Sequence, residues 1–130
     1  YWEDWLDFTR ESLLMRGLIS GEDFGLFTIV RDPAEAVKII DDFYRNYHSM
    51  RFVGQRLVIR LNKPLGPEEI EILEREFLEI IEPGSSLQQS GALPEEADQP
   101  DLLHLPRLVF EFNHKSYGLL KAFIRRINSF

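Results

Sequence analysis

The chain contains no cysteine among its 130 residues, which excludes a disulfide framework, a thiolate metal site and a cysteine nucleophile. It has no apolar run that approaches the roughly 20 residues of a membrane-spanning helix. Positive charge is scarce, because 15 Lys and Arg stand against 22 Asp and Glu. The net charge of −7 argues against nucleic acid as the main partner. We therefore expect a protein of the reducing cytoplasm with neither a membrane nor a nucleic-acid partner.

Motifs that would indicate catalysis are also missing. The three histidines, His48, His104 and His114, lack a second ligand at metal-like spacing, and there is no H-E-x-x-H motif. The sequence has no G-x-S-x-G turn and no glycine-rich phosphate loop. Asp41 and Asp42 form a carboxylate pair, but they fall in a predicted helix, where neighbouring side chains point apart. We predict no catalytic residue, no metal and no cofactor for this chain.

What the sequence does contain is a strand motif that occurs twice. Arg56–Asn62 reads RLVIRLN and Arg107–Asn113 reads RLVFEFN. In each motif apolar residues alternate along the chain, which is typical of a half-buried strand, and a helical pattern follows. A helix can cover the apolar face of the strand before it. We expect both strands to lie in one sheet.

The second half of the chain is predicted to have the order β–α–β–β–α. Its elements are a strand at Arg56–Asn62, a helix from Pro67 to Ile81, a weak edge strand at Ser86–Ala92, a loop at Pro94–Pro100, a strand at Arg107–Asn113 and a helix at Tyr117–Asn128. This order is that of a ferredoxin-like domain that lacks its final strand. A sheet ordered first–third–second would place the two motifs side by side and antiparallel.

In that sheet we expect Arg60 and Glu111 to pair on the exposed face. The open edge of the first strand needs a cover, which Leu26–Val30, an upstream strand or a second subunit could provide.

The first 47 residues are predicted to be α–β–α, the unit that closes a doubly wound Rossmann-like sheet. The expected elements are a helix at Tyr1–Arg16, a strand at Leu26–Val30 and a helix from Asp32 to Tyr47. Asp32 and Glu35 around Pro33 form a strong helix-start signal. Because Tyr47–Gln55 breaks the helical periodicity, we place a domain boundary there and predict domains at residues 1–47 and 48–130. The chain is α+β overall, and its opening at Tyr1, directly in a helix pattern, suggests a fragment of a longer protein.

Two tryptophans, Trp2 and Trp5, give the first turn a large apolar surface. They can contact an upstream segment, another subunit or the core of this chain itself, and the sequence does not choose among these partners.

One basic cluster is conspicuous in this acidic chain: Arg45, His48, Arg51 and Arg56. Arg and His side chains near a helix end can hold a phosphate or a carboxylate, so these four residues are a candidate anion-binding site. The alternative is structural, in that the cluster makes salt bridges between domains, for example to the acidic loop Glu95–Asp101.

The segments YWEDWLDFTRESLLMRGLIS and LFTIVRDPAEAVKIIDDFY resemble the end of the Rossmann-type domain of the Lonely Guy (LOG) family. The resemblance covers about residues 1–47. Residues 47–130, with YHSMRFVGQRLVIRLNKPL and LPRLVFEFN, resemble the C-terminal extension of a longer subgroup. The order and spacing of these motifs carry the resemblance.

The resemblance implies a nucleotide-binding, usually dimeric cytosolic protein. Members of the family cleave the N-glycosidic bond of nucleoside 5′-monophosphates. Their P-G-G-x-G-T-x-x-E segment, which supplies the phosphate-binding turn and a catalytic Glu, has no counterpart here. The implied partners are the upstream Rossmann domain, a nucleotide ligand and a second copy of the chain.

We thus expect the C-terminal part of a LOG-like protein that serves assembly or regulation and does not hydrolyse nucleotides alone. Two alternatives stay open: a small-molecule-binding module and a purely structural dimerisation element.

Overall fold

Strands β2 (Arg56–Leu61) and β4 (Arg107–Glu111) lie side by side and antiparallel in the computed structural model, which describes all 130 residues. They form the centre of a four-stranded sheet with the order β1-β2-β4-β3. The short edge strand β3 (Gln88–Ser90) pairs antiparallel with β4, as the first–third–second order predicts. The prediction that the two motifs share a sheet, and that the chain is α+β, is confirmed.

The segment Tyr47–Gln55, where the sequence analysis placed a domain boundary, forms the strand β1 (Tyr47–Val53) and the turn into β2, and this strand was not predicted. Val53 pairs with Arg56 across a turn of two residues, Gly54 and Gln55. Gly54 has a φ of +61°, which the tight turns of hairpins require and glycine adopts without strain. β1 therefore covers the edge of β2 that was expected to need an outside partner.

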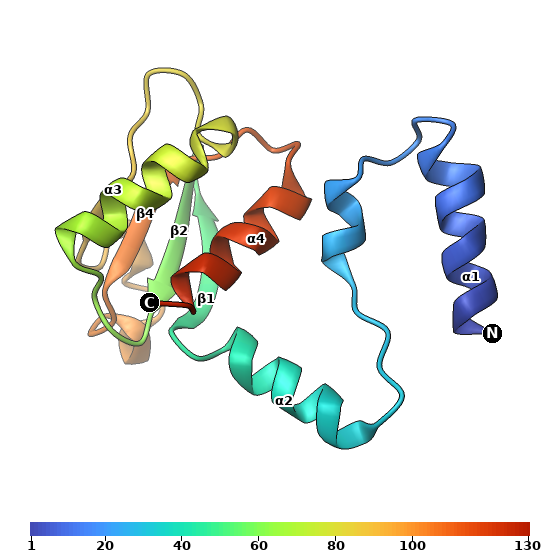
Figure 1. Cartoon of the computed structure of the whole chain (residues 1–130). Coiled ribbons are helices and arrows are strands. Elements are labelled where there is room, and N and C mark those ends of the chain that lie inside the picture. Colours follow the sequence, from blue (N-terminus) through green and yellow to red (C-terminus); the bar gives the residue numbers. More distant parts are fainter.

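Helices α3 (Pro67–Glu76) and α4 (Tyr117–Ile127) cover one face of the sheet (Figure 1). Both were predicted, although α3 ends earlier than expected and a short 3₁₀ turn, Leu78–Ile80, follows it. The alternating apolar residues of the two motifs point to this face and form the main core with the helices. From the sheet, the core includes Leu57, Ile59, Leu61, Leu108, Phe110 and Phe112, and from the helices Leu73, Leu120, Phe123, Ile124 and Ile127.

The other face of the sheet is covered by the loop between β3 and β4 instead of a helix. Val53, Val58 and Val109 form a small second core there, and Leu93 from the loop packs against it. The loop contains two single 3₁₀ turns, Pro94–Glu96 and Pro100–Leu102. Both faces of the central strands are thus buried. The expectation that Arg60 lies on an exposed face is therefore wrong.

The N-terminal part is mainly helical. Helix α1 (Trp2–Phe8) continues as a π-helix to Leu14, and a second helix, α2, spans Pro33–Phe43. As predicted, Asp32 caps α2, since its Oδ1 accepts a hydrogen bond of 2.9 Å from the Ala34 N–H. No helix of the chain is both long and apolar enough to cross a membrane.

The strand predicted at Leu26–Val30 is wrong. Leu26 ends the 3₁₀ helix η2 (Glu22–Leu26), and residues 27–30 form no strand. An isolated strand has no partner for its backbone groups, and β1 already occupies the sheet edge that this segment could have joined.

Helix η2 packs directly against α4, which links the N-terminal part to the sheet domain (Figure 1). The contact depends on Gly118, because a Cβ atom there would lie 2.4 Å from the carbonyl oxygen of Glu22. The two backbones can approach this closely only where α4 has no side chain.

Gly118→Ala should therefore lower the free energy of unfolding by about 1–3 kcal/mol, although alanine usually favours a helix over glycine. Gly25→Ala is the matched control, since a Cβ at Gly25 meets no atom within 4 Å. Urea denaturation of both variants checks this, and equal stability of the two would contradict the close contact.

Candidate functional site

Arg51 and Arg56, two of the four predicted anion-binding residues, contact the acidic loop. Arg51 Nη1 lies 2.8 Å from Asp98 Oδ1, and Arg56 Nη2 lies 2.9 Å from Glu95 Oε1. These two arginines thus make salt bridges to the acidic loop, as the structural alternative suggested, but the bridges lie within residues 48–130 and not between the two predicted domains.

The other two predicted residues, His48 and Arg45, have different partners. His48 lies on β1, and its Nδ1 is 2.9 Å from the Ser49 hydroxyl. Arg45 lies just after α2 and forms an ion pair with Asp42 one turn earlier. Its Nη1 also donates to the Asn128 carbonyl at 3.4 Å. Each of the four residues therefore already has a partner within the chain, and these partners differ.

A different charged cluster is buried between the loop and the sheet. Arg60 of β2 and Arg107 of β4 stand opposite one another in the register, and both contact Glu96 from the loop. The Arg60 Nη2 to Glu96 Oε1 distance is 2.7 Å, and the Arg107 Nε to Glu96 Oε2 distance is 3.0 Å. The predicted pair of Arg60 with Glu111 is wrong, because Glu111 is opposite Arg56.

All three side chains of this Arg60–Glu96–Arg107 cluster are almost fully buried, with exposed fractions of 3%, 0% and 0%. Arg107 also donates to the carbonyls of Leu102, Leu103 and Leu105. Every buried side-chain nitrogen and oxygen has a hydrogen-bond partner. Because its charges and hydrogen-bond donors are satisfied internally, the cluster holds the loop against the sheet and has no free group to bind a ligand.

The pKa of Glu96 reflects this environment. Burial alone would raise the pKa, but hydrogen bonds from the Leu93 N–H and from both arginines lower it from 4.5 to about 2. Glu96 therefore stays ionised at all pH values near neutrality and keeps the two arginines from repelling each other.

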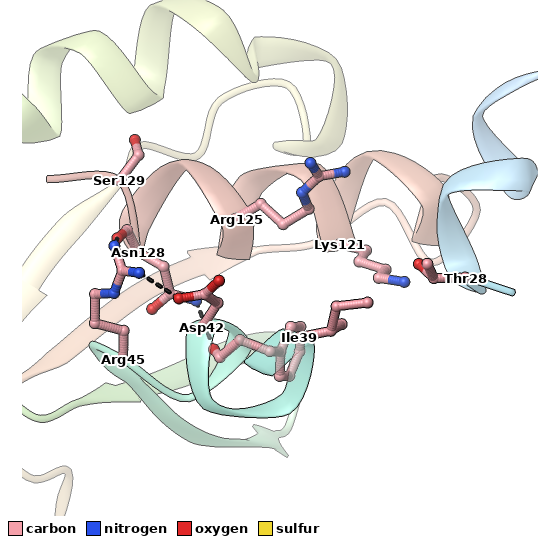
Figure 2. A pocket seen from close by; sticks show the side chains of 9 residues that line it. Thr28, Ile39, Asp42, Arg45, Lys121, Arg125, Asn128 and Ser129 are labelled. Atoms are coloured by element: carbon pink, nitrogen blue, oxygen red, sulfur yellow. Dashed lines mark hydrogen bonds and ion pairs between the residues drawn. The ribbon is translucent and has the colours of Figure 1, made fainter. Parts of the chain in front are cut away.

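The cleft between α2 and α4 is the better candidate for a ligand site (Figure 2). It is a cavity of about 510 Å³, within the range of small-molecule sites. Its lining residues are Thr28, Ile39, Asp42, Phe43, Arg45, Lys121, Arg125, Asn128 and Ser129. Of the predicted site residues, only Arg45 lies here.

Asn128 at the end of α4 fixes the geometry of this cleft. Its Oδ1 accepts hydrogen bonds from the N–H groups of Asn46, at 2.8 Å, and Tyr47, at 2.9 Å. Its Nδ2 donates to the Phe43 carbonyl at 2.5 Å. This buried side chain thus joins the end of α2, the start of β1 and the end of α4.

Positive charge is in excess at the cleft. The lining contains three cationic side chains, Arg45, Lys121 and Arg125, and one carboxylate, Asp42, which is already paired with Arg45. Lys121 and Arg125 belong to no ion pair. Burial, with the nearby Arg125 charge, lowers the pKa of Lys121.

Lys121 and Arg125 of the last helix were not among the site residues predicted from the sequence. Their spacing of four residues indicates a shared helix face, but nothing in the sequence showed that α2 lies opposite that face.

Comparisons with known proteins give no relative: no family model, no curated protein and no solved structure matches this chain.

Glu96→Gln should lower the free energy of unfolding at neutral pH by about 3 kcal/mol, because it leaves two buried arginines without a counter-charge. Glu95→Gln is the neighbouring control and should cost less than about 1 kcal/mol, since its pair with Arg56 is exposed. Urea denaturation measures both changes, and equal losses would contradict the role of Glu96.

The unmodified chain and the Glu96→Gln variant also test how the free energy of unfolding depends on pH. A carboxylate whose folded pKa is about 2 and whose ordinary value is 4.5 stabilises the fold fully only above that ordinary value. The difference in stability between the unmodified chain and Glu96→Gln should therefore shrink as pH falls from 4.5 toward 2. A difference that stays constant over this range would contradict the lowered pKa.

Asn128→Ala should lower the free energy of unfolding by about 2–4 kcal/mol, because it removes the oxygen that accepts hydrogen bonds from the Asn46 and Tyr47 amides. Hydrogen exchange at the Asn46 and Tyr47 amides should accelerate by more than the change in global stability explains, since these amides lose their partner locally. Asn62→Ala is the control, because exposed Asn62 reaches the same segment only through 3.4 Å hydrogen bonds to the Tyr44 and Arg45 carbonyls. Unchanged exchange in Asn128→Ala would overturn this assignment.

Proposed function

We propose that this chain is the C-terminal part of a LOG-like nucleotide-binding protein and that it serves assembly or regulation of the catalytic core. The observation that supports this proposal is the apolar surface of residues 1–46. The proposal also draws on the resemblance of the sequence motifs to that family.

Apolar side chains are exposed mainly in this N-terminal part. Eleven of the seventeen large hydrophobic side chains that are exposed lie within residues 1–46: Tyr1, Trp2, Trp5, Phe8, Met15, Leu18, Leu26, Val37, Ile39, Ile40 and Tyr44. Only Thr9 is fully buried in the same range. Large exposed apolar patches mark surfaces that contact another protein segment.

Two features of this part indicate where a partner would pack. Val37 and Ile40 of α2, and Tyr44 directly after it, follow one another at spacings of three and four, and each is more than half exposed. Beside α1, Trp2 and Trp5 line an apolar hollow of about 320 Å³ with residues 27–30. A neighbouring protein segment that covers the α2 face and the hollow beside α1 would account for the apolar side chains exposed at both.

The upstream Rossmann domain is the partner in this proposal. Residues 1–47 would be its last α–β–α unit, and residues 27–30, which have no sheet partner here, would pair with an upstream strand. Phe27 already has extended backbone angles, φ −131° and ψ 165°. Residues 48–130 would be an incomplete ferredoxin-like appendage, an interpretation supported by the adjacency of β2, β4 and β3.

Catalysis would then reside upstream, in the phosphate-binding glycine turn and the glutamate of the family, and the protein would act in the cytoplasm as a dimer. The competing function is a dimerisation module, in which a second copy of this chain covers the same apolar faces.

The sequence encoded immediately before Tyr1 tests the proposal. We expect a P-G-G-x-G-T-x-x-E segment within about two βαβ units of Tyr1. An upstream sequence without such a turn would contradict the family assignment.

The isolated 130 residues should release no adenine from AMP above the uncatalysed background, because they carry no catalytic motif. Light scattering on the same sample separates the two functions. Weak self-association that increases with concentration is expected from uncovered apolar surface, whereas a discrete, stable dimer would favour the dimerisation module. Adenine release at enzymatic rates would overturn the proposal.

A further inference from the structure

We infer that the cleft between α2 and α4 binds a small organic molecule that carries a phosphate monoester. This inference goes beyond the proposed function, since it depends on residues of this chain alone and not on the family assignment.

The charge of the cleft matches a dianion. Arg45, Lys121 and Arg125 carry three positive charges, and Asp42 is the single carboxylate among the lining residues. Two positive charges are left uncompensated, although the chain as a whole carries −7. A phosphate monoester near neutral pH carries nearly two negative charges, and guanidinium and ammonium groups bind it through charge-assisted hydrogen bonds.

The other arginines near the sheet do not compete for this ligand. Arg51 and Arg56 are paired with Asp98 and Glu95, and the buried cluster contains its own carboxylate. Lys121 and Arg125, one turn apart on α4, have no carboxylate partner. These two cations are therefore free to bind an anion in the cleft.

The cleft is larger than a phosphate group needs. About 510 Å³ accommodates an organic group beside the anion, and the wall includes the apolar side chains of Ile39 and Phe43. Thr28, Asn128 and Ser129 add polar groups to the lining. In Figure 2, Lys121 extends toward Thr28, whereas Arg45 and Asp42 lie at the opposite end near Asn128. A ligand in the cleft would thus meet positive charge at both ends and an apolar surface between them.

Binding of phenyl phosphate, followed by amide chemical shifts of the full 130-residue chain, tests the inference. The probe should bind saturably and shift the amides of residues 39–46 and 121–129. Inorganic phosphate should bind about tenfold more weakly, because it lacks the ring that contacts the apolar wall. Phenol, which lacks the anion, should not bind.

The double variant K121Q/R125Q should weaken phenyl phosphate binding at least tenfold. The matched control is K38Q/K115Q, which removes two exposed lysines outside the cleft and changes the net charge equally. The control should stay within twofold of the unmodified chain.

Three results would overturn the inference. They are the absence of saturable binding to the unmodified chain, shifts confined to residues outside the cleft, and equal weakening by the two double variants. The last result would indicate attraction by net charge alone. The shift map is recorded on the unmodified chain, so the test stands even where K121Q/R125Q does not fold.

Discussion

The register of β2 against β4 determines most of this structure, because it places two arginines directly opposite each other on a buried sheet face. Two like charges in this position repel, and the low dielectric of the interior strengthens their repulsion. Glu96 resolves the conflict by accepting hydrogen bonds from both Arg60 and Arg107. The loop that carries Glu96 must therefore lie across the sheet, where it also covers the small valine core. One carboxylate thus connects strand register, loop position and the burial of the second sheet face.

Period-two alternation in the two related motifs was sufficient to predict strands β2 and β4 and their adjacency. The same pattern did not identify β1, because Met50 and Phe52 remain partly exposed at the sheet edge and Tyr47–Gln55 was interpreted as a domain boundary instead of a strand and a hairpin turn. The burial of Arg60 was also missed. Arginine in a strand normally indicates a solvent-facing position, and nothing local signals that a carboxylate 36 residues later will reach it. Such long-range pairing depends on the fold and not on neighbouring residues.

The residues of the candidate site were likewise only partly predictable from the sequence. Arg45 was recognised because basic residues cluster near the end of α2, but its companions in that cluster face the acidic loop or Ser49. Lys121 and Arg125 join Arg45 only because Asn128 ties the ends of α2 and α4 together. An asparagine near the end of a helix is an ordinary feature of a sequence. Its three hydrogen bonds to segments more than 80 residues earlier could be found only in three dimensions.

The central claim is the register that sets Arg60 opposite Arg107, and nuclear Overhauser contacts across β2 and β4 measure it directly. The account predicts cross-strand backbone contacts between Val58 and Val109 and between Arg60 and Arg107. Contacts that instead pair Arg60 with Glu111 would contradict it, because the two arginines would no longer face each other and Glu96 would have no reason to be buried.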